Sequence, residues 1–127
     1  MQLKNKLYTI TAKETDGKTS ATFELRLDPE CFIYKAHFPG QPITPGVCIV
    51  QTAKELLEEM TGKALDIVFA KNVKFLSVVT PTDSPTLVYN INKVAWSEDG
   101  QEVKAQMAVS SSTEAKAKVS LVCRIHD

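Results

Sequence analysis

Residues 37–51 read HFPGQPITPGVCIVQ, and this stretch decides the fold more than any other part of the chain. Its three prolines fix their own φ and bias the residue before each one toward extended backbone, and its two glycines permit turns that other residues avoid. The run therefore predicts a stiff, shaped loop that presents His37 beside a helix beginning at Gly46. Such a loop is typical of a segment that positions a functional side chain.

The sequence on either side of this loop shows two periods. From Gly46 to Met60 the apolar residues recur at helical spacing, with Gly62 just past the end. Asp28 to Pro45 has no clear period and predicts a buried, shaped loop. Elsewhere apolar residues alternate with polar ones, as in strands. The expected strands are Leu7–Ala12, Thr19–Leu27, Leu65–Phe75, Thr86–Trp96, Gln101–Ser111 and Ala115–Ile125.

This order of two strands, one long helix and four strands predicts an α+β fold, with an antiparallel sheet wrapped around the helix. A chain of 127 residues that is 43% hydrophobic can bury a sizeable core without disulfides or metal. Neither a repeat nor a linker interrupts it. We therefore expect residues 1–127 to form a single domain.

Composition excludes several classes of function. Fifteen basic residues balance fifteen acidic ones, so the whole chain has no electrostatic footprint for nucleic acid or for an anionic membrane. No apolar run approaches membrane-spanning length, and the first ten residues, MQLKNKLYTI, lack an apolar leader core. We expect no nucleic-acid partner, no membrane association and a cytoplasmic location.

The cysteines point the same way. Cys31, Cys48 and Cys123 form no CxxC pair and show no metal-ligand spacing with the two histidines. Their odd number argues against a disulfide framework. Reduced thiols in a cytoplasmic protein, and no metal site, are the expectation.

The stretch from His37 to Gln51 resembles the signature of the FabZ/FabA-like 3-hydroxyacyl-(acyl carrier protein) dehydratases, approximately H-F-P-G-x-P-x-x-P-G-V-x-x-x-E, at every position except the last. Residues 69–75, FAKNVKF, also look like the family's first strand after the helix. The resemblance implies a hotdog fold, a homodimer or a multiple of dimers with sheets paired edge to edge, and no cofactor. The implied reaction converts 3-hydroxyacyl thioesters on acyl carrier protein to trans-2-enoyl thioesters, in fatty acid or related acyl-chain synthesis.

The resemblance also assigns a site. His37 corresponds to the family's histidine, and Gln51 stands where the family has its catalytic glutamate, supplied by the other subunit. The N–H of Gly46 corresponds to the donor that binds the thioester oxygen. The further substrate contacts that it implies are Phe38, Pro45 and Val47.

Dehydration needs a base for the C2 proton, a donor for the thioester carbonyl and an acid for the departing hydroxyl. A histidine ring can be neutral and basic at physiological pH, and the first N–H groups of a helix suit an enolate-like oxygen. The amide of Gln51 does not titrate and can only form hydrogen bonds. The third role is therefore the open question.

Three answers remain open. His37 can serve as both base and acid, with Gln51 orienting the hydroxyl or a water. Glu55, one turn further along the same helix face, can supply the carboxyl, because the family often has a glutamine there and the pair looks exchanged. The third answer is a binding pocket without chemistry. The alternative functions are therefore a hotdog thioesterase that uses Glu55, and a catalytically weakened acyl-binding or partner subunit.

Overall fold

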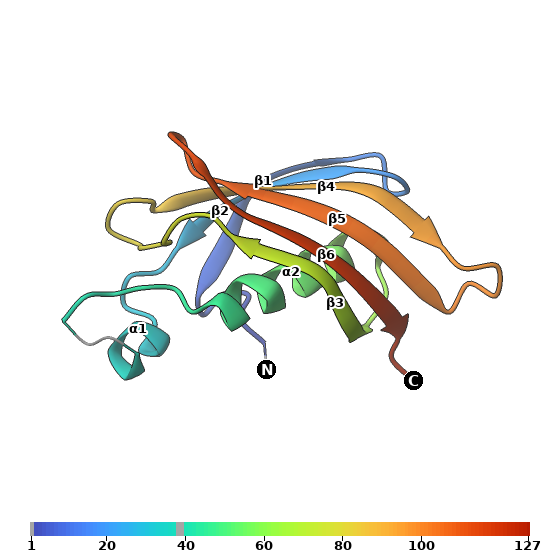
Figure 1. Cartoon of the computed structure of the whole chain (residues 1–127), viewed down its shortest axis with the longest axis horizontal. Coiled ribbons are helices and arrows are strands. Elements are labelled where there is room, and N and C mark those ends of the chain that lie inside the picture. The colour runs from blue at the N-terminus through green and yellow to red at the C-terminus, as the bar shows by residue number, and fades with distance from the viewer. Residues whose placement is uncertain (1, 38–39) are drawn as a thin grey trace.

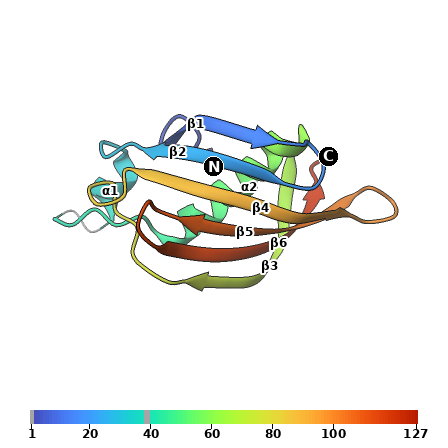
Figure 2. The same cartoon turned by 90° about the horizontal axis from the view of Figure 1, so that it is seen from above.

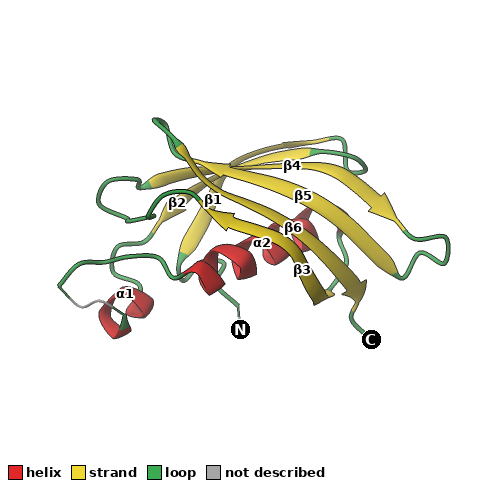
Figure 3. Ribbon diagram, in the orientation of Figure 1, coloured by secondary structure: helices red, strands yellow, loops and turns green. Residues whose placement is uncertain are grey.

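The computed structural model describes residues 2–37 and 40–127, and it consists of one curved antiparallel sheet that arches over one long helix (Figure 1). Figure 3 shows the same two layers by element type, with the long helix beneath the sheet. The predicted α+β architecture is confirmed. The elements are β1 (Tyr8–Thr15), β2 (Ala21–Leu27), α1 (Phe32–Ala36), α2 (Gly46–Thr61), β3 (Leu65–Phe75), β4 (Thr86–Trp96), β5 (Glu102–Ser110) and β6 (Ala115–Ile125).

The six strands lie in the order β1-β2-β4-β5-β6-β3, and every neighbouring pair is antiparallel. Figure 2 shows this order from above, with β1 and β3 at opposite edges. Strands β4, β5 and β6 follow one another through hairpins, whereas α2 carries the chain from the β2 side to the far edge. Strand β3 contains two irregularities in its register with β6, which increase local bending.

Helix α2 begins at Gly46, as the sequence predicts, and ends within one residue of the predicted end. Pro45 is its N-cap in extended backbone, with φ −61° and ψ 145°. Gly62 ends it in the left-handed region at φ 71°, which glycine adopts without a Cβ penalty, and its N–H donates to the Glu58 carbonyl at 2.8 Å. The helix is one residue longer than predicted, ending at Thr61.

The core lies between α2 and the concave face of the sheet. Strand β2 alternates strictly, so that Phe23 and Leu25 are buried while their chain neighbours are exposed. Leu56 and Leu57 of α2 meet this face and are fully buried. No helix in the described ranges has the length and apolar content needed to cross a membrane.

The segment from Asp28 to Pro45 differs from its prediction in one respect. It was predicted as a loop without regular structure, but it contains the five-residue helix α1. Ile33 and Tyr34 are the buried residues of that helix, and two residues on one turn are too few to show a helical period. The predicted burial of this segment is nevertheless found at these two side chains.

Truncation of Phe23 to alanine should lower the free energy of unfolding by about 3–5 kcal/mol, because the side chain is 0% exposed and leaves a cavity between the sheet and α2. Urea denaturation followed by circular dichroism measures the change. The same substitution at Phe32, which is 61% exposed, is the matched control and should change stability by less than about 0.5 kcal/mol. Equal losses at both positions would contradict the placement of the core.

Candidate functional site

His37 lies at the C-terminal end of α1, where the helix turns into extended backbone. Its N–H donates to the Ile33 carbonyl at 3.0 Å, and its ring is exposed. Phe38 and Pro39 follow it outside the described residues, so the expected substrate contact at Phe38 has no described place. The structure therefore presents the histidine ring at the surface, directly after a short helix that the sequence did not predict.

A buried hydrogen bond closes the loop that carries His37. The hydroxyls of Tyr34 and Thr44 lie 2.8 Å apart, and the Thr44 N–H donates to the Val79 carbonyl at 2.7 Å. Burial raises the pKa of Tyr34 to about 12, so this hydroxyl keeps its proton at physiological pH. The loop is therefore fastened on both sides of His37, by α1 before it and by Thr44 after it.

Gly46 forms the first turn of α2, and the ring of Phe75 lies directly against it. A Cβ at this position would stand 2.6 Å from the Phe75 Cζ atom, so the glycine permits a close approach between α2 and the end of β3. The first N–H groups of a helix have no acceptor within the helix. Pro45, half-buried, precedes this turn as its N-cap, and Val47 follows it, 69% exposed.

A cavity of about 390 Å³ opens beside this first turn. One side comes from the start of α2 and the residue before its cap, and the other from the end of β3 and the segment after it. Most of the side chains are apolar. Its lining residues are Thr44, Gly46, Ile49, Phe75, Leu76, Ser77, Val78 and Val79.

Lys116 holds the outer wall of this cavity, a role that the sequence did not reveal. Its buried ammonium donates to the Val78 carbonyl at 2.8 Å and to the Ser77 hydroxyl at 3.1 Å, and it pairs with Glu114 at 2.7 Å. The pairing with Lys116 and the hydrogen bond from Ser77 hold the pKa of the Glu114 carboxyl below its usual range. The lysine therefore organises the segment that follows β3.

Gln51 and Glu55 lie together on α2, one turn apart. The Gln51 Nε2 donates to the Glu55 Oε2 at 2.9 Å. The Gln51 side chain is half-buried, whereas Glu55 is only 5% exposed. The predicted sharing of one helix face by these two residues is thus visible as a direct contact, and the carboxyl is the deeper of the two.

Three further donors surround the Glu55 carboxylate, two from the N-terminal segment and one from the start of β1. The backbone N–H groups of Leu3 and Lys4 and the hydroxyl of Tyr8 donate to it at 2.8, 2.8 and 2.9 Å. Burial and the negative charge of Glu55 raise the pKa of Tyr8, which keeps this hydroxyl a donor. Glu55 is the acceptor in all four of these hydrogen bonds. This pattern suits an ionised carboxylate, which has no proton to donate.

The structure therefore groups the expected site residues unequally. Gly46 lines the cavity, and Gln51 contacts Glu55. No hydrogen bond between described residues joins the His37 side chain to Gly46, Gln51 or Glu55 within one chain. The described residues also contain no group of three or more metal-ligating side chains.

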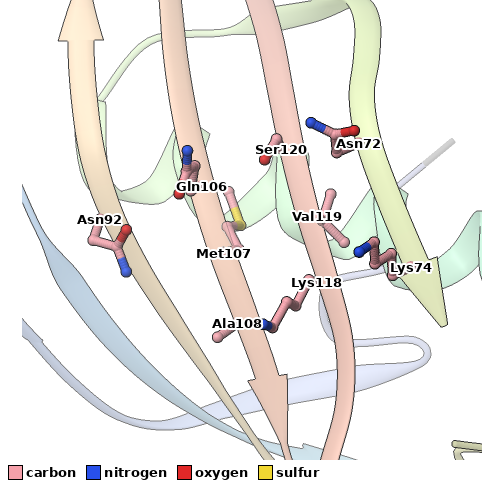
Figure 4. Close-up of a pocket in the computed structure, with 9 residues that line it drawn as sticks. All are labelled: Asn72, Lys74, Asn92, Gln106, Met107, Ala108, Lys118, Val119 and Ser120. Atoms are coloured by element: carbon pink, nitrogen blue, oxygen red, sulfur yellow. The ribbon is translucent and has the colours of Figure 1, made fainter. Parts of the chain in front are cut away.

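A second hollow, of about 430 Å³, lies on the other face of the sheet (Figure 4). Its polar side chains come from four adjacent strands, in a register that pairs Asn92 with Gln106, Gln106 with Ser120 and Ser120 with Asn72. The alternate residues Met107 and Val119 are buried against the core, so this polar row points away from α2. None of the expected site residues lines it.

The cysteines are poor candidates for a nucleophile. All three are buried, and burial raises the pKa of Cys48 near the start of α2 and raises that of Cys123 to about 11. The thiolate is the reactive form of cysteine. We therefore expect Ellman's reagent to modify less than one thiol per folded chain within minutes at pH 8, and all three thiols after unfolding in guanidinium. Rapid labelling of the folded protein that Cys48→Ser abolishes would contradict this.

Comparison with known proteins identifies the class. A family model described as "ApeI-like: ApeI dehydratase" matches residues 12–119. A structure of the dehydratase heterocomplex ApeI:P from Xenorhabdus doucetiae superposes with a TM-score of 0.69 at 22% identity, covering 92% of this chain and 98% of that one. A mutant thioesterase from Pseudomonas aeruginosa superposes with a TM-score of 0.64 at 13% identity, covering 93% and 80%. The fold is thus the predicted hotdog fold.

The family model covers most of the chain, which therefore belongs to the ApeI-like dehydratase family. The chain is also 35% identical over 69 residues to the 3-hydroxyacyl-[acyl-carrier-protein] dehydratase FabZ of Ligilactobacillus salivarius (strain UCC118), covering 49% of each. The match spans about half the length of such curated relatives.

Proposed function

We propose that this chain dehydrates 3-hydroxyacyl thioesters carried by acyl carrier protein to trans-2-enoyl thioesters, in the cytoplasm. The observation that carries the proposal is the apolar cavity at the first turn of α2, because it combines room for an acyl chain with helix N–H groups. Membership of the ApeI-like family supports it. Phe38, Pro45 and Val47 are the proposed further contacts to the acyl thioester.

In the proposed reaction the thioester carbonyl accepts a hydrogen bond from the Gly46 N–H, where the positive end of the α2 dipole favours the enolate-like oxygen. The neutral His37 ring takes the C2 proton, and the imidazolium returns that proton to the C3 hydroxyl. The C3–O bond breaks, water leaves and the double bond forms between C2 and C3. No proton or electron is left over, so the step needs no cofactor or metal.

Gln51 has a hydrogen-bonding role in this scheme. Its amide cannot supply a proton, and Glu55 faces four donors, so His37 carries both acid and base duties. General acid–base assistance is worth about 10²–10⁴-fold in rate, which bounds the cost of lacking a second proton donor. A slow but real dehydratase is the expected outcome.

The proposed active unit is a homodimer, or a multiple of dimers, joined through the β3 edge. Strand β3 lies at the open edge of the sheet (Figure 2), and its Val68 and Phe69 side chains are half exposed. Phe75 at the end of β3 and Val47 at the start of α2 add exposed apolar surface beside the cavity. Pairing two such edges covers this surface.

A second candidate is a partner subunit that completes a site with a competent relative. Two observations favour it: Gln51 stands where the dehydratase signature has a carboxylate, and the ApeI:P structure from Xenorhabdus doucetiae is described as a heterocomplex. A thioesterase is less well supported, because the donors around Glu55 leave this carboxylate no geometry for attack on a thioester carbon.

The decisive assay is dehydration of a purified 3-hydroxyacyl carrier-protein thioester, followed by absorbance of the conjugated enoyl product. We expect turnover by the native protein and a loss of at least about 10³-fold in His37→Ala, which removes the base and the acid together. His126→Ala is the matched control and should retain native turnover. His126 is exposed near the C-terminal end of the chain, where its ring contacts the Asp66 carboxylate. Turnover that survives His37→Ala would overturn the proposal, and turnover only after a relative is added would favour the partner subunit.

The dimer has its own test in sedimentation equilibrium. The native chain should sediment at twice its 14.0 kDa mass or at a whole multiple of that dimer mass, whereas Phe69→Lys should lose the paired edge and sediment at a lower mass, because two like charges then meet across the paired edges. Thr9→Lys, an exposed position on the opposite edge strand β1, is the matched control and should keep the native mass. A Phe69→Lys variant that keeps the native mass would contradict pairing through the β3 edge and show that the interface lies on another surface.

A further inference from the structure

The Glu55 carboxylate is the most densely hydrogen-bonded side chain near the proposed site. Its Oε2 accepts from the Leu3 N–H and from the Gln51 Nε2, and its Oε1 accepts from the Lys4 N–H and the Tyr8 hydroxyl. An ionised carboxylate offers about four lone-pair sites, so these donors match its full accepting capacity. Glu55 is therefore held from two sides, by the N-terminal segment and by α2.

This arrangement fixes which end of the Gln51 amide faces Glu55. An ionised carboxylate only accepts hydrogen bonds, so the NH₂ end of the amide must point toward it, as the 2.9 Å contact shows. The carbonyl oxygen is then the end directed away from Glu55. A carbonyl oxygen has two lone pairs and can accept more than one hydrogen bond.

We propose that Glu55 is a positioning residue for Gln51: it orients the Gln51 amide so that the carbonyl oxygen accepts a hydrogen bond from the substrate's C3 hydroxyl. This inference rests on the proposed dehydration. The O–H of the substrate then points at Gln51, and a lone pair of the same oxygen is left to receive the proton from His37. The amide thus aligns the leaving hydroxyl without giving or taking a proton.

The same contact explains why position 51 is neutral in this chain. A carboxylate at position 51 would stand one hydrogen-bond length from the ionised Glu55, and two such groups cannot both ionise freely. The residues at positions 51 and 55 are therefore coupled: a buried carboxylate at position 55 requires a donor at position 51.

The test is a double-mutant cycle of Gln51→Leu and Glu55→Gln, measured as kcat and KM for the carrier-protein thioester. Each single variant should lower kcat at least about tenfold with KM changed less than about threefold, and the double variant should lose no more than Gln51→Leu alone, because Glu55 acts on the substrate only through Gln51. Glu59→Gln is the matched control: Glu59 also pairs with Lys4 from α2 but lies eight residues beyond Gln51 on that helix, so the variant should keep native kcat. Losses that simply multiply in the double variant would overturn the proposal.

A second measurement keeps the positioning role testable if Glu55→Gln does not fold or if the native protein shows no turnover. In the Gln51→Glu variant, ¹³C NMR should show the carboxyl at position 51 keeping its proton well above the pH at which an isolated glutamic acid ionises, because Glu55 lies beside it. Ionisation like that of an isolated glutamic acid would show that the contact is absent in solution and would overturn the inference. A raised value without any turnover would uphold the contact between residues 51 and 55 but refute the dehydratase proposal, and with it the role of Gln51 toward the substrate hydroxyl.

Discussion

A buried carboxylate must be surrounded by hydrogen-bond donors. At Glu55 this constraint fixes the positions of the N-terminal segment, β1 and α2 relative to one another. The four donors come from the N-terminal segment, from β1 and from α2 itself, so the charge is compensated only when these parts lie in their observed places. The hydrophobic face of α2 supplies the bulk of the packing against the sheet. The hydrogen bonds of Glu55 add a specific position and rotation of α2 about its axis, which apolar contacts alone do not define.

The start of α2 shows how the same helix serves packing and chemistry. Its first turn is buried on one side at Cys48 and Ile49, while Gly46 meets the Phe75 ring and borders the cavity. The N-terminal end of the helix therefore borders a mainly apolar cavity, where its free N–H groups and the positive end of its dipole can meet an oxygen of a bound ligand. A thioester oxygen is the kind of group that gains from such a position.

The sequence predicts most of the fold because its periods are clean. Strand β5 alternates through Val103, Ala105 and Met107, and the sheet pairs it with β6 over nearly its whole length. Helix α2 is marked by apolar spacing and by Gly62. The five-residue α1 escapes prediction because one turn carries no measurable period, and its one buried polar contact, from Tyr34 to Thr44, joins residues ten apart in a proline-rich stretch.

The site is predicted less completely. The sequence motif points to Gly46, and the structure shows it beside a cavity, but the sequence leaves Glu55 open as a proton donor. The partners that change this interpretation, Leu3, Lys4 and Tyr8, lie 47 to 52 residues away, and no local pattern announces contacts at that separation. The contact of Lys116 with the cavity wall at Val78 could not be predicted from the sequence for the same reason, because these residues also lie far apart along the chain.

The most direct test of this account is a crystal structure of the protein with a stable 3-hydroxyacyl-pantetheine amide, in which nitrogen replaces the thioester sulfur. The account predicts the carbonyl oxygen at the Gly46 N–H, and the C3 hydroxyl within about 2.6–3.2 Å of both the His37 ring of one subunit and the Gln51 amide of the other. A ligand bound away from the first turn of α2, or a hydroxyl that contacts neither side chain, would contradict it.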